Sequence, residues 1–225
     1  MKKTLLVMIA LVAAKVSIAQ YGANDKRVQL GFTASPLISV LNPQESGVKR
    51  NSVKVGFNFG LMADLRLNES GTYSLSSGFQ ALFAGSTLKY DAGVGLSDFK
   101  AVPSEYNMKL TYVEIPLALK LKTKPVNDMT WFGQFGTFFD FPVAGRANVI
   151  SAGQTFNKVN ILPEMNRINI GMLIGAGVEY PLGETLRGMA GITYQNGFVD
   201  VTRNKKWNDG RINMNSFALR LGIYF

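Results

Sequence analysis

Hydrophobic and polar residues alternate along most of this chain, in segments separated by stretches rich in glycine, asparagine and proline. Successive side chains of a β-strand point to opposite faces, so a period of two predicts strands with one apolar face. No segment shows a convincing helical period. We predict eight strands, at Arg27–Ser39, Ser52–Leu67, Tyr73–Leu88, Tyr106–Lys122, Met129–Phe141, Arg167–Tyr180, Thr185–Asn196 and Ile212–Phe225.

The two faces of the even-numbered predicted strands differ in chemistry. One face takes every second residue of Val53–Leu67, Val113–Leu121, Ile168–Tyr180 and Phe217–Phe225, and it contains no charge. A narrow barrel interior has to be filled by its own side chains, so small residues beside ionised ones suit an inward face. We therefore predict that the apolar face points outward toward lipid and that the other face forms ion pairs inside the barrel. The charged residues of this inward face are Lys54, Asp64, Arg66, Glu114, Lys120, Lys122, Glu179 and Arg220.

The connections between the predicted strands alternate in length. Those after the second, fourth and sixth strands have about four to six residues, whereas the others have between about eleven and twenty-four. Outer-membrane barrels have short turns on the periplasmic side and long loops outside, with both termini in the periplasm when the strand number is even. The alternating residues and the alternating loop lengths together predict an all-β fold. This fold is a single antiparallel up-and-down transmembrane barrel of about eight strands in a Gram-negative outer membrane.

The first nineteen residues have the layout of a secretory signal. Lys2 and Lys3 form a positive start, and the apolar run Leu5–Ala14 that follows is too short to span a bilayer as a helix. The small residues of Ser17-Ile18-Ala19 suit a signal peptidase. We predict that residues 1–19 are a signal peptide, cleaved before Gln20, and that residues 20–225 form the barrel domain.

Composition excludes several kinds of chemistry. Removal of three lysines with the signal leaves 24 − 3 = 21 basic and 15 acidic residues, a formal charge of +6 that is spread along the chain and predicts no nucleic-acid binding. The absence of cysteine excludes disulfides, and the absence of histidine excludes Ser-His-Asp hydrolysis and most zinc sites. Asp64, Glu114 and Glu179 share a face with basic residues, which favours ion pairing over acid–base catalysis. We predict no catalytic, cofactor-binding or metal-binding residue, and no cofactor.

Aromatic residues mark the short-turn end of the predicted strands. Tyr73 and Trp131 lie where two strands begin, while Tyr180 and Phe225 lie where two others end. Aromatic rings favour the headgroup level of a membrane, so we interpret them as a girdle on the periplasmic side. The final strand alternates up to the terminal Phe225, which is typical of the signal used by the barrel assembly machinery. We predict that this machinery and outer-membrane lipid are partners, and that the protein is a monomer.

The segment Tyr112-Val113-Glu114-Ile115-Pro116 resembles the Tyr-x-Glu-Ile-Pro stretch of the PorT-like outer-membrane β-barrel family. The second and third predicted strands, and the sixth and seventh, form two glycine-spaced hairpins with tight turns at Leu65–Tyr73 and Glu179–Leu186. Together with the signal and the terminal aromatic strand, these hairpins extend the resemblance over the mature chain. It implies a small barrel; one member is linked to protease secretion, a role that a shared fold does not transfer. Because proline cannot donate to a strand ladder, we predict bulges at Pro116 and Pro36.

Three functional hypotheses follow from these observations. The leading one is a structural or interaction barrel with a filled lumen, the second is a narrow porin-like channel for small solutes, and the third is a soluble periplasmic ligand-binding barrel. Basic residues in the last two long loops are either a surface for lipopolysaccharide or a protein partner, or simply solvated. They are Lys158, Arg203, Lys205, Lys206 and Arg211, with Trp207 among them.

Overall fold

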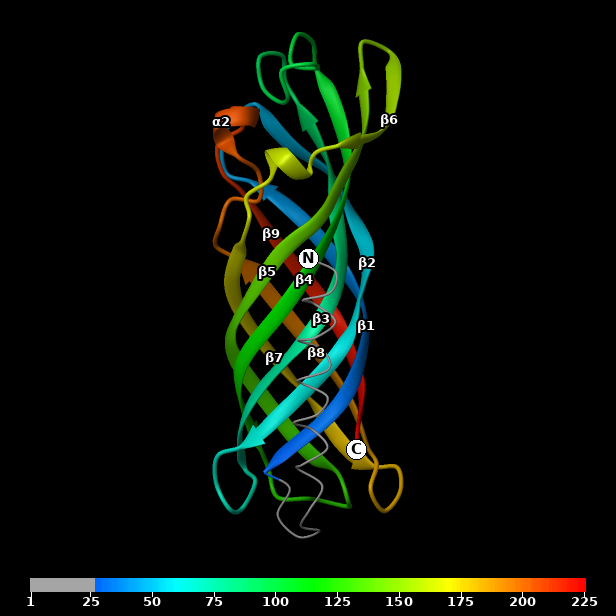
Figure 1. The fold of residues 1–225 in the computed structure, drawn as a ribbon, viewed down its shortest axis with the longest axis vertical. Helices are drawn as coiled ribbons and strands as arrows, with labels where there is room; N and C mark the ends of the chain where they lie inside the picture. The colour runs from blue at the N-terminus through cyan, green and yellow to red at the C-terminus, as the bar shows by residue number, and fades with distance from the viewer. Residues whose placement is uncertain (1–26) are drawn as a thin grey trace, which may run out of the picture.

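A computed structural model of the protein describes residues 27–225, so the predicted signal peptide lies outside the described residues. Eight strands close into one antiparallel barrel in the order β1-β2-β3-β4-β5-β7-β8-β9, with β9 pairing back to β1 (Figure 1). The remaining strand, β6, lies outside this ring and pairs only with the C-terminal part of β5, between Arg146 and Ser151. The predicted eight-stranded barrel is confirmed. The strands are β1 Val28–Pro43, β2 Val48–Arg66, β3 Tyr73–Tyr90, β4 Ser104–Lys122, β5 Thr130–Ser151, β6 Gln154–Asn160, β7 Asn169–Pro181, β8 Arg187–Gly197 and β9 Ile212–Tyr224.

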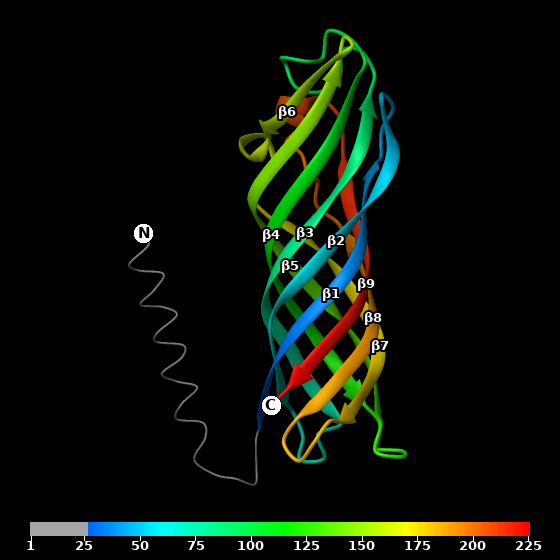
Figure 2. The ribbon, with the colours of Figure 1, turned by 90° about the vertical axis from the view of Figure 1, so that its right-hand side faces the viewer.

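The two ends of the barrel differ as the loop rhythm predicted for three of the four long connections, but the first one, between β1 and β2, has only residues 44–47 because both strands extend into it. Short turns of residues 67–72, 123–129 and 182–186 join the strands at the lower end in Figure 1, where the C-terminus also lies. The upper end holds residues 91–103, the β5–β6 hairpin, the 3-10 turn η1 (Leu162–Glu164) and the helical turn α2 (Asn204–Trp207). Figure 2 shows the same arrangement after a quarter turn. We call these the short-turn end and the long-loop end.

Six of the eight predicted strands are too short at the long-loop end; the exceptions are β7 and β9. The largest error is in β5, which continues from the predicted end at Phe141 to Ser151. The ladder between β4 and β5 has a register shift where Thr111 pairs with Ala144 and Tyr112 pairs with Pro142. An extra residue on one strand reverses which parity faces inward, so the alternation in the sequence breaks although the strand continues.

The bulges predicted at Pro116 and Pro36 are wrong. Both prolines keep the regular register, with Pro116 opposite Phe138 and Pro36 opposite Phe57. Each strand instead loses pairing briefly with its other neighbour, at the missing proline N–H, and the register is the same beyond the gap.

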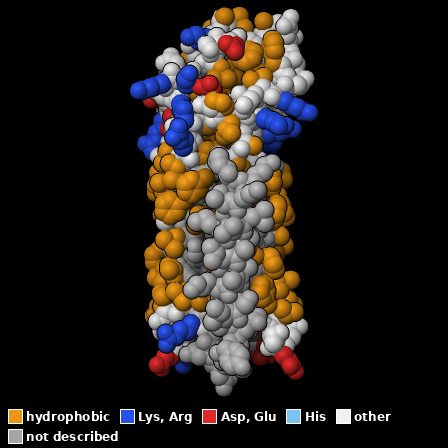
Figure 3. Space-filling model, viewed as in Figure 1, with side chains coloured by type: hydrophobic (Ala, Val, Ile, Leu, Met, Phe, Trp, Pro, Cys, Tyr) orange, Lys and Arg blue, Asp and Glu red, His pale blue; other side chains and the backbone are white. Residues whose placement is uncertain are grey.

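The apolar face points outward, as predicted. Phe59, Leu61, Leu117, Ile174 and Leu219 are exposed. On the face seen in Figure 3, hydrophobic side chains cover a broad band of the barrel, and Lys and Arg side chains gather directly above it. None of the helices in residues 27–225 is long and apolar enough to cross a membrane.

The inside of the barrel changes character along its axis. Toward the short turns the buried residues include Asp64, Lys120 and Glu179. Toward the long loops they form one apolar cluster that contains Leu88, Tyr106 and Trp207. Because β2 to β5 have 18 to 22 residues and a membrane strand needs only about 9–11, these strands extend well past the apolar band.

Candidate functional site

A charged cluster crosses the lumen near the short-turn end. Lys120 of β4 lies with Nζ at 2.8 Å from Asp64 Oδ2 of β2 and 2.5 Å from Glu179 Oε1 of β7. Lys122 lies 3.0 Å from Glu179 and 3.5 Å from Asp64. Tyr224 of β9 donates its hydroxyl to Asp64 at 3.0 Å and accepts from Lys120 at 2.9 Å. Side chains from four strands therefore fill this level of the barrel.

Neutral side chains complete the charged cluster. Ser76 donates to the second oxygen of Asp64 at 2.6 Å, and the ring of Phe132 lies 4.4 Å from the Lys120 ammonium. A buried ammonium needs an opposite charge and hydrogen bonds to offset its lost hydration. The carboxylates, the hydroxyls and the aromatic faces supply them here. This chemistry stabilises charges and leaves no exposed reactive group.

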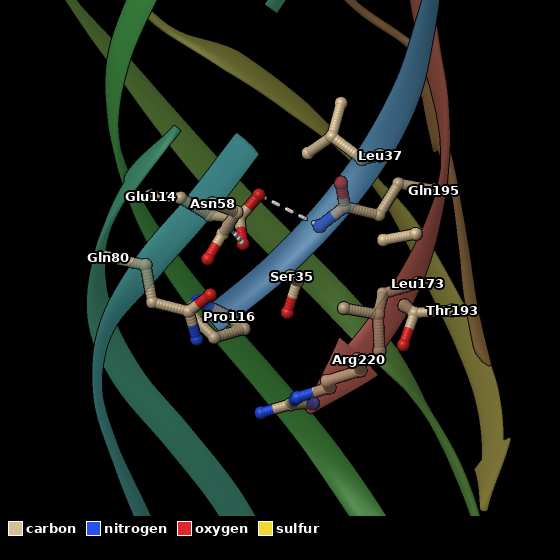
Figure 4. A pocket seen from close by; sticks show the side chains of 11 residues that line it. Ser35, Leu37, Asn58, Gln80, Glu114, Pro116, Leu173, Thr193, Gln195 and Arg220 are labelled. Carbon is tan, nitrogen blue, oxygen red and sulfur yellow. Dashed lines mark hydrogen bonds between the residues drawn. The ribbon is translucent and has the colours of Figure 1, made fainter. Parts of the chain in front are cut away.

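A small polar cavity lies above the charged cluster, near the middle of the barrel (Figure 4). Its volume is about 30 Å³, which is room for one or two water molecules. Glu114 lies on its wall, where Gln195 donates to Oε2 at 2.8 Å and Asn58 donates to Oε1 at 3.2 Å. Arg220 donates instead to Gln134, at 3.2 Å. The cavity is too small for an organic substrate.

Two buried carboxyl groups lie on neighbouring strands beside this cavity. Glu114 of β4 is directly opposite Asp140 of β5 in the ladder, and Asn169 donates to Asp140 at 3.0 Å. Paired carboxyl groups can serve as acid and base in hydrolytic enzymes, but both must reach a substrate. Both groups here are almost completely buried, at 2% and 0% exposure. Neither carboxyl group is therefore open to solvent.

An apolar core closes the lumen at the long-loop end. The indole of Trp207 in α2 is fully buried, within 5.2–5.6 Å of the rings of Tyr106 and Tyr90, and its Nε1 donates to the carbonyl of Glu164 at 3.0 Å. Asp209 follows α2 and is buried as well; it accepts from Tyr90 Oη at 3.0 Å and Thr202 Oγ1 at 3.1 Å. Burial raises the pKa of Asp209 to about 7.

The structure brings together part of the predicted inward set. Asp64, Lys120, Lys122 and Glu179 form the charged cluster. Glu114 and Arg220 face the cavity, where each bonds to amide side chains. Arg66 keeps the inward parity, opposite the buried Ser74, but is exposed at the end of β2 and joins no ion pair within residues 27–225. Lys54 lies outside the barrel, against β4, so the prediction of its inward position is wrong.

Tyr224 and Asp140 are among the interior groups that sequence reasoning missed. Tyr224 has the same parity as Arg220 in the last strand, so the alternation itself was sufficient to find it. Asp140 lies in β5, where the register shift next to Pro142 interrupts the alternation of apolar and polar residues.

The residues predicted as a basic loop surface differ in their exposure to solvent. Lys205 and Lys206 are exposed on α2, and Lys158 is exposed in β6. Trp207 does not belong with them, because it is the centre of the apolar core. Within residues 27–225, no group of three or more His, Cys, Asp or Glu side chains is placed to hold a metal ion.

A closed antiparallel barrel with an apolar outer band and a polar interior defines a transmembrane β-barrel of the outer-membrane class. The chain belongs to the outer membrane protein beta-barrel domain family, whose model matches residues 18–202. A soluble periplasmic barrel is therefore excluded. No curated protein matches the chain.

Several solved structures have a similar fold. Neisserial surface protein A (NspA) is 14% identical, with a TM-score of 0.48, over 88% of this chain and 96% of its own. The Pseudomonas aeruginosa outer membrane protein OprG is 12% identical, with a TM-score of 0.42, over 88% and 94%. The Escherichia coli outer membrane protease OmpT is 11% identical, with a TM-score of 0.40, over the same shares. These likenesses concern the barrel fold alone.

Proposed function

We propose that the protein is a non-enzymatic outer-membrane barrel with a closed lumen, which acts through the surface at its long-loop end. The observation behind this proposal is that side chains occupy the lumen at successive levels. The charged cluster around Lys120 lies at one end, the cavity of about 30 Å³ in the middle and the core around Trp207 at the other end. A porin-like channel would need a continuous water-filled path.

The absence of enzyme chemistry is the second part of the proposal. The chain has no histidine and no cysteine. Its buried carboxyl pair, Glu114 and Asp140, lies beside a cavity that holds only water-sized molecules. The Tyr112–Pro116 stretch also supports placing the protein in the PorT-like branch of the family, as a barrel without an assigned chemistry.

The orientation is the third part of the proposal. Short turns and the C-terminus share one end, and long loops occupy the other, which is the usual outer-membrane arrangement with periplasmic turns. We place both termini in the periplasm and the long loops outside the cell.

Conductance tests the closed lumen. Purified protein inserted into planar bilayers is expected to give no channel steps. Insertion is verified by quenching of tryptophan fluorescence with brominated lipid, which reports Trp131 because Trp131 is exposed on the outer surface and Trp207 is fully buried. Steady single-channel steps from inserted protein would refute the closed lumen and support the narrow porin-like channel instead.

Cysteine labelling tests the orientation, and the chain has no cysteine of its own to interfere. Ser97→Cys in the long β3–β4 loop is expected to react with a membrane-impermeant maleimide on intact cells. Gly183→Cys in the β7–β8 turn is the matched control, which should react only after the outer membrane is permeabilised. The opposite labelling pattern would show that the long loops face the periplasm and that the proposed orientation is wrong.

A further inference from the structure

A row of four cations crosses the outer surface of the barrel just beyond the apolar band. It contains Lys54 of β2, Lys109 of β4, Arg146 of β5 and Lys158 of β6, which we call the cation row. Lys109 and Arg146 are direct cross-strand partners, and Lys158 donates its backbone N–H to Asn148 of β5 at 2.9 Å. Four strands thus bring together residues that are up to about a hundred positions apart in the sequence.

The fold holds these side chains in place. Lys54 reaches across β3 to donate to Asn107 Oδ1 at 2.8 Å and to the Met108 carbonyl at 3.1 Å. It crosses at Gly85, where a Cβ would lie 3.0 Å from the Lys54 side chain and 2.1 Å from the Met108 carbonyl oxygen. Beside it, an open groove of about 210 Å³ is lined only by cationic and amide side chains, those of Lys109, Arg146, Asn148, Asn157 and Lys158.

No carboxylate in residues 27–225 forms an ion pair with any member of the cation row. Like charges directly opposite each other in a ladder are destabilising, so the Lys109–Arg146 pair disfavours the fold unless an anion lies against it. The next outward row along β3 and β4 is different, because Lys89 there lies 3.8 Å from Glu105. Lys49 of β2, opposite Lys89, also has no carboxylate partner within residues 27–225, so the level of the cation row is distinguished by its groove of cationic and amide side chains.

That level is where the lipid headgroups begin. Exposed apolar residues lie directly below the cation row, Phe57 on β2 and Val143 on β5, with Phe83 on the intervening strand β3. Figure 3 shows basic side chains immediately above the hydrophobic band. An anion held by the row could thus have acyl chains lying along the barrel below it, which a free anion in solution lacks.

We propose that the cation row binds the phosphate groups of a phosphorylated glycolipid of the outer leaflet, of the lipid A type. Arg146 provides the planar fork that pairs with two phosphate oxygens, and the lysines provide point charges around it. The assignment to the outer leaflet rests on the proposed orientation. The binding chemistry is independent of the orientation, because it depends only on the cation row and on the apolar surface below it.

Binding in neutral detergent tests the proposal. The full-length folded protein is titrated with diphosphoryl lipid A, and bound lipid is counted by native mass spectrometry. The triple variant Lys109→Gln, Arg146→Gln, Lys158→Gln is expected to bind on the order of tenfold or more weakly, because three charge-assisted contacts are lost. Lys89→Gln removes one paired cation from the row above and is the matched control, expected to bind as the wild type does. All variants must show the heat-modifiable gel shift of a folded barrel.

Equal binding by the triple variant and the wild type would overturn the proposal. So would equal affinity for diphosphoryl lipid A and for lipid A without phosphates. Inorganic phosphate that displaces lipid A at matching concentration would identify a free-anion site and overturn the assignment to lipid. Weak displacement by phosphate, with strong loss in the triple variant, supports it. Because none of these measurements depends on cells or on conductance, their failure is distinct from a failure of the closed lumen or of the orientation.

Discussion

The charged cluster in the lumen predicts a large effect from one buried lysine. In Lys120→Met, the side chain keeps much of its length but loses the ammonium that contacts Asp64, Glu179 and Tyr224 at 2.5–2.9 Å. All three charged side chains of these ion pairs are 1% exposed, so two carboxylates stay buried after the change.

The size of the loss follows from what remains. Breaking a buried ion pair by removing one partner costs about 3–5 kcal/mol. Lys122 still lies 3.0 Å from Glu179 and 3.5 Å from Asp64, and it compensates in part. We therefore expect a decrease of about 3 kcal/mol in the free energy of unfolding, at the lower end of that range.

Urea unfolding of protein refolded into lipid vesicles measures this loss, with the heat-modifiable gel shift as the readout. Lys124→Met is the control, since Lys124 is exposed in a short turn and its loss should be almost neutral. Adding Glu179→Gln to Lys120→Met should recover about 1–2 kcal/mol, because one of the two uncompensated charges is removed. A loss below about 1 kcal/mol in Lys120→Met, without coupling to Glu179, would refute the reasoning.

Three further predictions concern the lipid face, the loop core and assembly. Leu117→Arg places a charge on the outward apolar face and should destabilise the refolded barrel by about 2–4 kcal/mol in the same urea titration, whereas Thr155→Arg, exposed on β6 beyond the band, should be nearly neutral. Asp209 keeps its proton to about pH 7 when folded but releases it near pH 4 when unfolded, so its contribution should fall as pH rises from about 4 to 7, by at most about 4 kcal/mol; Asp209→Asn should remove that pH dependence, and an identical pH profile in both proteins would contradict the assignment. Deletion of Phe225 should lower the outer-membrane yield in cells while refolding into vesicles stays efficient, and an unchanged cellular yield would count against an assembly signal.

The sequence was sufficient to predict the barrel because alternation and loop length are local properties. The outward position of Leu117 and the inward position of Lys120 both follow from parity within one unbroken strand. Prediction failed where a bulge changed the parity, as at Pro142, and where a strand passed the membrane boundary, as in β5.

The interior partners could not be predicted for a different reason. Which residues meet across a lumen depends on the stagger of all the strands, and no single segment encodes it. Asp64 and Glu179 are 115 positions apart, since 179 − 64 = 115, yet both contact Lys120. Lys54 shows the same limit, because its parity pointed inward while irregular pairing between β2 and β3 placed it outside.

The change of the interior from polar to apolar along the axis has a consequence for how the protein can evolve. On β4, the inward positions are Glu114 and Lys120 beside the lipid band, but Tyr106 and Met108 beyond it. Inside the barrel, a hydrophobic-to-polar substitution is therefore tolerated beside the lipid band and disruptive beyond it. On the outer surface, the same substitution is disruptive within the band and tolerated beyond it. The depth at which the barrel is inserted is thus encoded in the strands themselves. The tips of the long β3–β4 loop and of the β5–β6 hairpin can diverge without changing it.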